Sequence, residues 1–562
     1  TFQHLAYQVS IINCTNDKMR QRQHKFLSLS SSHQVHLNDG SGVDVCISFL
    51  SAILLLVILS HPNNNNTVFS FVPTPTIATI LRPHQTTALR FVHDIAMLPR
   101  TSTTTTTMTK LQQAAVGDTD INVEKIPSWE ELSDITKCNE HEQPIAVNGA
   151  DYSSHPSFED DKPILYRERH GWCPYSERVW LALEVFNVDY NTIYIDNIYG
   201  RPTWYSGDTP QMKWPDGKTQ SESMDLVREI NTRYGSGSSS DTTSNNNNID
   251  LYPPDIVNDV VNKIREFQNI FPKRCRPSSR AAFLFRYDGE PLWKNEFEIV
   301  LEKTNELLAP SKKQDAGPFF CGSRFTAADI AWVSFLERYA GQLPSLHDGL
   351  DPKNDQQYPH LAKWYTAMET SPSIAVYGCK LRGDHSSWRK VLTMAGFGNA
   401  GNVPAVTVSR MEKLAQQECQ PLSLELQQQQ QLLWEHYITS TTSKGANRQY
   451  VASSPNKEAA AVLIRNRLSI VKDIFKRSKN TTTVLPANNR DEMYTIMRSL
   501  AYLLCNYDDV TNDDGSDGSE STLLQQCKND VQVQALASYL NDRMAVPRDM
   551  GAVSAGYFKR IM

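Results

Sequence analysis

The chain has 562 residues, of which 40% are apolar, so it is long enough for about two to four domains and can bury at least one core. Its net charge of −6 and its lack of Lys/Arg-rich blocks exclude nucleic acid as a main partner, because phosphate binding needs concentrated cationic side chains. Its ten cysteines are scattered without paired spacing, which argues against a disulfide framework or a metal site and indicates a reducing compartment.

Residues 1–120 are predicted to form a disordered leader that carries a targeting signal. The apolar run at 43–60 has the length of a short membrane-spanning helix and fits either an anchor or the apolar part of a signal peptide. The run VFSFVP (68–73) resembles the signal/transit junction of plastid proteins in algae with complex plastids. If this leader is used, we expect a plastid location. If synthesis starts at Met97 or Met108, we expect the cytoplasm.

The block 160–234 has the pattern of a mixed α/β domain. The runs PILYRE (163–168) and YNTIYI (190–195) are rich in apolar, β-branched and aromatic residues, as strands are. Between them Pro174 stands where a helix accepts proline, and apolar residues follow at helical spacing. The turn at 215–217 predicts a hairpin, and a second helix follows it. This order, βαβ and then ββα, predicts a thioredoxin-like α/β domain.

The block 251–390 is predicted to be all-helical, after a linker insertion at 235–250. Two of its segments have apolar residues at helical spacing. Its clearest local signal is the run FTAADIAWVSFLERYA, in which Thr326 can cap a helix whose third residue is Asp329. We therefore expect Thr326 and Asp329 to have a structural role.

The rest of the chain alternates low-complexity runs with helical patterns. Residues 391–454, which include the glutamine run at 426–433, are predicted to be a linker because they lack the apolar content that offsets ordering entropy. The acidic run at 508–521 is predicted to be a surface loop for the same reason. Apolar periodicity elsewhere in 455–562 predicts a helical C-terminal extension.

The run GWCPYS places Cys173 directly before a predicted helix. Free N–H groups and the helix dipole stabilise a thiolate at such a position. Ser176 stands where a second cysteine would complete a dithiol motif, so a mixed disulfide on Cys173 would have to be resolved by a thiol from a small molecule. The alternative is a chance motif around an inert buried cysteine.

These segments together resemble a known family. The run ILYRERHGWCPYSERVWLALEV is followed by GRPTWY, by TP, by SESMDLV and by FTAADIAW, and their order is similar to that of glutathione transferases, nearest the omega and lambda classes. The resemblance covers roughly residues 160–385. It implies a thioredoxin-like domain followed by an all-helical glutathione transferase C-terminal domain, and the extension beyond it resembles those of some algal and plant relatives.

The resemblance also assigns residues to the site. Cys173 would form the mixed disulfide with glutathione, and Thr209, ahead of a cis Pro210, would offer its backbone to the cysteinyl part of the tripeptide. Glu222 and Ser223 would hold the γ-glutamyl group at a helix start.

Arg201 would face the glycyl carboxylate of glutathione. Two alternatives remain open: Glu222 can be a helix cap, and Arg201 an ordinary surface charge. The segment between Trp204 and Pro210 is shorter than in omega enzymes, which weakens the assignment of Arg201.

By resemblance the chain is expected to be a glutathione-dependent thiol transferase, reducing mixed disulfides, dehydroascorbate or glutathionyl conjugates. Glutathione would be the co-substrate, no metal is expected, the mature protein would not insert stably into a membrane, and a homodimer is possible in this family. The alternative is a non-catalytic binding module, similar to the chloride intracellular channel proteins that carry a related Cys-Pro-x-Ser motif and associate with membranes.

Overall fold

The computed structural model describes residues 35–37, 45–47, 125–136, 145–147, 155, 158, 161–197, 201–235, 249–310, 316–393, 403–442, 452–478, 487, 489–507 and 518–561. The chain divides into two units, residues 1–98 and residues 99–562. In the first unit, β1 (Val35–Leu37) and β2 (Val45–Ile47) pair antiparallel within the predicted disordered leader.

Most of the predicted leader and its targeting features lie outside the described residues. These features are the transit junction at 68–73 and most of the apolar run at 43–60, of which β2 covers three residues. Most of the linker insertion at 235–250 and of the acidic run at 508–521 lies outside them too. In the part of the chain that is described, no helix combines the length and the apolar character needed to cross a bilayer.

The second unit contains a five-stranded mixed sheet. Its order is β3-β5-β4-β6-β7, with β3, β5 and β4 parallel and the hairpin of β6 and β7 antiparallel to them. The predicted strands and hairpin are confirmed, whereas the edge strand β3 lies ahead of the predicted domain. The strand bounds are β3 Ile145–Val147, β4 Ile164–Glu168, β5 Asn191–Ile195, β6 Gln211–Lys213 and β7 Thr219–Ser221.

Two helices complete the thioredoxin-like domain. Helix α7 (Pro174–Val185) begins at Pro174, as predicted, and nearly all of its residues are buried. Helix α8 (Ser223–Tyr234) follows the hairpin, as predicted, and buries Leu226, Val227 and Ile230. The strand and helix order therefore confirms a thioredoxin-like fold.

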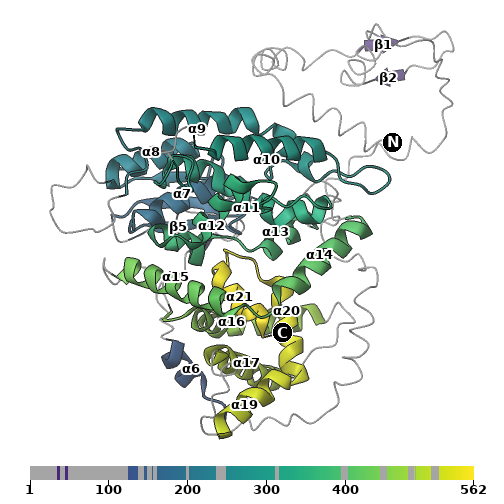
Figure 1. The fold of residues 1–562 in the computed structure, drawn as a ribbon. Helices are drawn as coiled ribbons and strands as arrows, with labels where there is room; N and C mark the ends of the chain where they lie inside the picture. The colour runs from purple at the N-terminus through teal and green to yellow at the C-terminus, as the bar shows by residue number, and fades with distance from the viewer. Residues whose placement is uncertain are drawn as a thin grey trace. The chain divides into compact units, whose positions relative to one another are not determined.

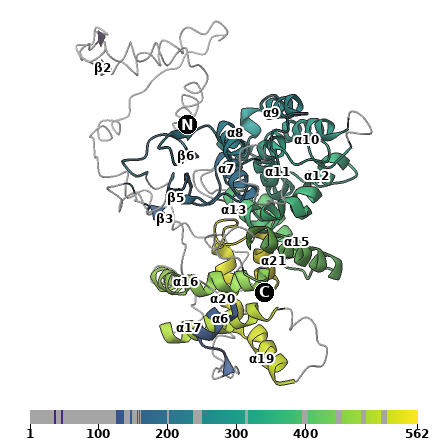
Figure 2. The same ribbon diagram turned by 90° about the vertical axis from the view of Figure 1, so that its left-hand side faces the viewer.

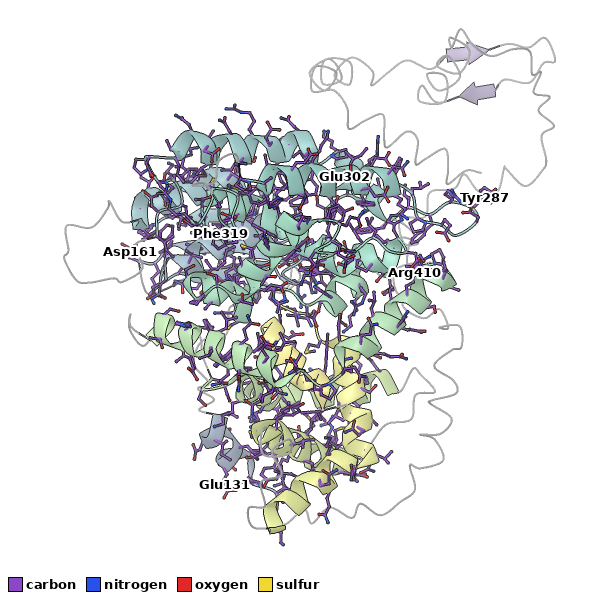
Figure 3. All side chains as sticks on the ribbon, in the orientation of Figure 1. Glu131, Asp161, Tyr287, Glu302, Phe319 and Arg410 are labelled. Atoms are coloured by element: carbon purple, nitrogen blue, oxygen red, sulfur yellow. The ribbon has the colours of Figure 1, made fainter. Side chains whose placement is uncertain are left out.

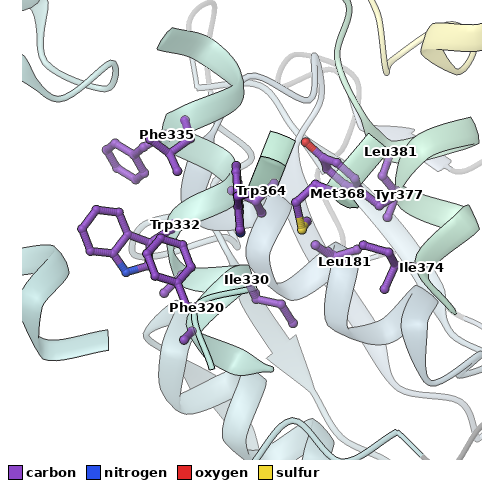
Figure 4. Close-up of a cluster of buried hydrophobic side chains, with 14 of the residues drawn as sticks. Leu181, Phe320, Ile330, Trp332, Phe335, Trp364, Met368, Ile374, Tyr377 and Leu381 are labelled. Carbon is purple, nitrogen blue, oxygen red and sulfur yellow. The ribbon is translucent and has the colours of Figure 1, made fainter. Parts of the chain in front are cut away.

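An all-helical domain follows, as predicted. Its apolar residues continue the core of the α/β domain, so one buried cluster spans both domains (Figure 4). Figure 4 shows Leu181 of the α/β domain in this cluster together with Trp364 and Met368 of the all-helical domain. The helices are α9 Val257–Ile270, α10 Lys294–Leu308, α11 Ala327–Leu346, α12 Pro359–Thr370 and α13 His385–Leu392.

The start of α11 contains the predicted capping box. The Thr326 hydroxyl accepts the N–H of Ala328, and the Asp329 carboxylate accepts the N–H of Thr326 at 2.9 Å. The other Asp329 oxygen accepts the N–H of Phe320 at 3.1 Å and the indole N–H of Trp364 at 3.0 Å. Asp329 is fully buried, so these bonds give it a structural role.

The prediction of a linker at 391–454 is corrected by two helices. Helix α14 (Ala405–Glu418) is tied to the end of α11, because Arg410 donates to the carbonyl of Leu346 at 3.0 Å (Figure 3). The glutamine run lies inside α15 (Leu424–Thr442), which buries Trp434 and Tyr437 in the cluster that spans the α/β and all-helical domains. Glutamine favours helix, and a few large apolar residues on one face were enough to anchor it.

The C-terminal extension has a core of its own. Its helices are α16 Pro455–Ser478, α17 Arg490–Cys505, α19 Gly518–Asn529, α20 Val531–Arg543 and α21 Ala552–Arg560. Most apolar residues at helical spacing in α16 and α17 are buried in this core, as predicted, but Leu468 of α16 is 65% exposed. Helix α21 lies between α16 and the all-helical domain in both views (Figures 1 and 2).

A helix that precedes the α/β domain in the chain joins this second core. Helix α6 (Trp129–Thr136) begins with a capping box, in which Ser128 and Glu131 exchange backbone-to-side-chain bonds of 2.6 and 3.2 Å. Its Leu132 is fully buried against the extension. The second core therefore combines α6, from the beginning of the second unit, with the helices of the extension at its end.

Candidate active site

Cys173 is the N-cap residue of α7, and Pro174 occupies the first helical position. Its side chain is half-buried, and its Sγ donates to the carbonyl oxygen of Thr209 at 3.6 Å. Ser176, one turn further on, is 2% exposed, and its hydroxyl has no protein partner. The sulfur therefore sits at a helix N-terminus, as the sequence predicts, and beside the backbone carbonyl of Thr209.

The loop before Cys173 is held by a buried carboxylate that the sequence reading missed. Glu168, the last residue of β4, accepts the N–H of His170 at 2.7 Å and the N–H of Trp172 at 2.8 Å. Burial raises the pKa of Glu168, while these bonds and nearby Arg167 act to lower it. The available signal was the pair of charged residues, Arg167 and Glu168, at the end of a strand that begins with apolar residues.

The same loop is fixed from the helical domain. Arg338 on α11 donates to the carbonyl of Trp172 at 3.0 Å and to the carboxylate of Glu177 at 2.6 Å. Both charged side chains are buried, at 3% and 2% exposure, so each needs the other. The position of Cys173 therefore depends on contacts from both domains.

The peptide bond between Thr209 and Pro210 is cis, as the resemblance implies. Thr209 is buried, and its hydroxyl accepts from the side-chain amide of Asn197 at 3.0 Å. Its carbonyl faces the sulfur of Cys173. The structure thus brings Cys173, Thr209 and Pro210 together.

Glu222 and Ser223 meet at the start of α8. Glu222 is the N-cap residue with a φ of 71°, is exposed and makes no capping bond with its side chain. The alternative of a side-chain helix cap is therefore not supported. Ser223 is buried, and its hydroxyl accepts from the guanidinium of Arg178 at 3.5 Å.

Arg178 is a second residue that the sequence reading missed. It is buried on α7 with its guanidinium 4.7 Å from the ring of Phe267, and it also donates to the carbonyl of Ala331. Burial lowers the pKa of Arg178 to about 10. Arg178 thus connects Ser223 at the start of α8 with Ala331 on α11. The only sign of this role in the sequence was its position next to Glu177 in a helix rich in apolar residues.

Arg201 is engaged with its own loop. Its guanidinium donates to the carbonyl of Gly207 and lies 3.4 Å from the carboxylate of Asp208, which is 98% exposed. This loop leads directly into Thr209. The guanidinium of Arg201 is therefore held by the short loop between Trp204 and Pro210, where it pairs with the exposed Asp208.

Cys173 is expected to be the most reactive of the ten thiols. Burial raises the thiol pKa of six other described cysteines: to about 12 for Cys275, Cys321 and Cys505, to about 11 for Cys527, and upward for Cys379 and Cys419. Iodoacetamide labelling followed by peptide mapping at about pH 6 measures each rate. Faster labelling of any other cysteine would contradict the assignment.

Two family matches cover this region of the chain. Residues 172–233 match the family described as "Glutathione S-transferase, N-terminal domain", and residues 286–380 match "Glutathione S-transferase, C-terminal domain". The chain carries the two domains of a glutathione S-transferase. All six candidate site residues lie in the first matched range, whereas α16 to α21 lie beyond both transferase domains.

Three other proteins are similar to parts of this chain. The chain is 27% identical to pyrimidodiazepine synthase of Drosophila melanogaster over 233 residues, which is 39% of this chain and 82% of that protein. Glutathione transferase Omega 1C of Trametes versicolor is 18% identical with a TM-score of 0.31, over 42% of this chain and 98% of its own. The trimeric glutathione transferase TDR1 of Leishmania is 20% identical with a TM-score of 0.32, over 41% of this chain and 48% of its own.

Proposed function

We propose that the protein is a glutathione-dependent thiol transferase that uses Cys173 as its nucleophile. The observation that carries this proposal is the half-buried Cys173 sulfur at the N-terminus of α7, with Ser176 in place of a second thiol. A thiolate there is stabilised by the free N–H groups of the helix. Because position 176 has no sulfur, a small-molecule thiol must complete the reaction.

The reaction proceeds in two exchanges. The Cys173 thiolate attacks the glutathionyl sulfur of a mixed disulfide, so a Cys173–glutathione disulfide forms and the other thiol leaves as a thiolate that takes a proton from water. A second glutathione thiolate then attacks the glutathionyl sulfur on Cys173. The Cys173 thiolate is released together with oxidised glutathione, so each turnover consumes one mixed disulfide and one reduced glutathione and yields one free thiol and one oxidised glutathione.

Glutathione would lie between β6 and the start of α8. We propose that the Thr209 backbone pairs with its cysteinyl part and that Glu222 and Ser223 bind its γ-glutamyl end, as the family resemblance implies. A positive φ at a residue other than glycine is typical of functional sites, and Glu222 has one. Arg201 can exchange its exposed partner Asp208 for the glycyl carboxylate, because exposed ion pairs contribute only about 0–1 kcal/mol.

Activity assays of the full chain with two substrates test the proposal. We expect turnover of the mixed disulfide of glutathione and 2-mercaptoethanol, and little conjugation of 1-chloro-2,4-dinitrobenzene, because a cysteine tends to trap glutathione as a disulfide. Absence of thiol transfer together with glutathione binding would favour the alternative, a non-catalytic binding module. A preference for conjugation would also overturn the proposal.

Glu222→Ala is expected to weaken glutathione binding by about 1–3 kcal/mol, the contribution of a charge-assisted hydrogen bond. Because the Glu222 side chain makes no capping bond, the melting temperature should stay the same. Asp225→Ala, which removes the acid in the first turn of the same helix, is the matched control and should bind normally. Isothermal titration with reduced glutathione measures both. Equal binding by the two variants would remove Glu222 from the site.

A further inference from the structure

The C-terminal extension contacts the loop that precedes Cys173. Gly171 has a φ of 76°, and a Cβ at this position would lie 3.4 Å from Cγ and 3.5 Å from Cδ of Pro547. Nη1 of Arg548 lies 3.3 Å from Nδ1 of His170. A segment more than 370 residues away in sequence therefore packs against the loop that carries the candidate nucleophile.

The segment is anchored on the transferase side by α13. The N–H of Val546 donates to the buried hydroxyl of Ser387 at 2.8 Å, and Lys390 donates to the carbonyl of Met544 at 3.0 Å. Further along, Gly551 packs so closely on the backbone of Cys379 that a Cβ would overlap its carbonyl. The contact with the Cys173 loop is thus part of a larger, hydrogen-bonded interface between the extension and the all-helical domain.

Arg548 is oriented by the residue that follows it. Its Nε and Nη2 donate to the two carboxylate oxygens of Asp549, each at 2.7 Å, which is the paired geometry of a guanidinium and a carboxylate. Asp549 in turn accepts the N–H of Ala545 at 2.8 Å. The third nitrogen, Nη1, is thereby aimed at His170.

The contact of Arg548 with His170 requires a neutral imidazole. A guanidinium has no acceptor, so Nδ1 of His170 must accept from Arg548 and the imidazole must be neutral. The charged groups around His170 are Glu168, which accepts its backbone N–H at 2.7 Å, and Arg169, Asp196, Arg548 and Asp549. Burial first, and then the two arginines, lower the pKa of His170 to about 4. The imidazole therefore remains neutral at physiological pH.

The His170 ring stacks on the ring of Trp172 with centroids 4.4 Å apart and planes 17° apart. The backbone N–H groups of both residues are bonded to the Glu168 carboxylate, and Cys173 is the next residue. A change in the orientation of His170 would therefore be transmitted to the sulfur through Trp172.

We propose that Arg548 is a positioning residue for Cys173 and that the extension completes the transferase site. This inference rests on the proposed function, since it gives Cys173 the role of nucleophile. The matched transferase domains end at residue 380, so neither of them includes this contact.

The test compares Arg548→Ala with Arg543→Ala in the full chain. Arg543 is a similarly exposed arginine of the same extension whose guanidinium pairs with Asp473 at 3.5 Å. Its only contact with Arg548 among the described bonds is through its backbone carbonyl, at 3.4 Å, which the alanine variant keeps. We expect Arg548→Ala to lower kcat for thiol transfer about 10- to 100-fold with little change in KM, because small displacements of a nucleophile have effects of this size. Arg543→Ala should match the unmodified protein.

A second readout needs no glutathione. The rate of Cys173 alkylation by iodoacetamide, followed between about pH 5.5 and 8.5, should fall in Arg548→Ala and its midpoint should move, while the Cys321 rate stays the same. Arg548→Lys should restore part of the rate, since lysine keeps the charge but not the fork that pairs with Asp549. If the unmodified protein lacks transferase activity, the proposed function fails, while this readout still tests the positioning.

His170→Phe keeps the ring stacking but removes the acceptor for Arg548. It should lower the alkylation rate as Arg548→Ala does, and the double variant should be no slower than either single one, because both changes break one contact. If Arg548→Ala fails to fold, Arg548→Lys and His170→Phe decide the question. Alkylation rates and midpoints in these variants equal to those of Arg543→Ala would overturn the proposal.

Discussion

Replacing Cys173 by serine is expected to reduce thiol transfer by about a thousandfold or more, because a hydroxyl neither ionises near neutral pH nor exchanges with a disulfide. The substitution changes one atom of a half-buried side chain at a helix N-terminus, so the fold and the melting temperature should be unchanged. The measurement is the steady-state rate with a glutathionyl mixed disulfide. Intact mass after incubation with that disulfide should show one glutathione on the unmodified protein and none on the variant.

Cys321→Ser is the matched control, since Cys321 is also half-buried but its thiol pKa is raised to about 12 by burial. It should retain full activity and still carry glutathione after incubation. Retained activity in Cys173→Ser, or loss of activity in both variants alike, would contradict the assignment of the nucleophile.

Asp329→Ala is expected to destabilise the all-helical domain by about 3–7 kcal/mol. The change leaves two buried donors without a partner, the N–H of Phe320 and the indole N–H of Trp364, and each such group costs about 1–3 kcal/mol. It also removes half of the capping box of α11, which contributes about 1 kcal/mol more. Hydrogen exchange of peptides from α11 measures the free energy of opening of this domain in the full chain.

Thr326→Ala serves as the graded control, because it removes the cap hydroxyl and leaves the Asp329 bonds to Phe320 and Trp364 in place. It should cost only about 1 kcal/mol. Burial raises the pKa of Asp329 to about 6, so the comparison at about pH 7.5 concerns the ionised carboxylate. Equal losses in the two variants would show that Asp329 acts as a cap alone.

The sequence by itself determined the elements whose signals are local. Pro174 marked the start of α7, Thr326 and Asp329 marked the start of α11, and apolar periods marked the helices between them. Such signals act within one or two turns of chain, so they can be read without knowing the fold. The same locality identified Cys173 as a thiol at a helix start.

The tertiary structure alone decided which distant groups meet. Glu168 and Arg178 gave little local sign of their roles, because a buried charge is explained only by the partners that surround it. The glutamine-rich segment forms helix α15 because its Trp434 is buried in a core contributed by distant parts of the chain. The contact of Arg548 with His170 joins residues 378 positions apart, and no local pattern specifies a contact whose geometry depends on how two separately packed cores are joined.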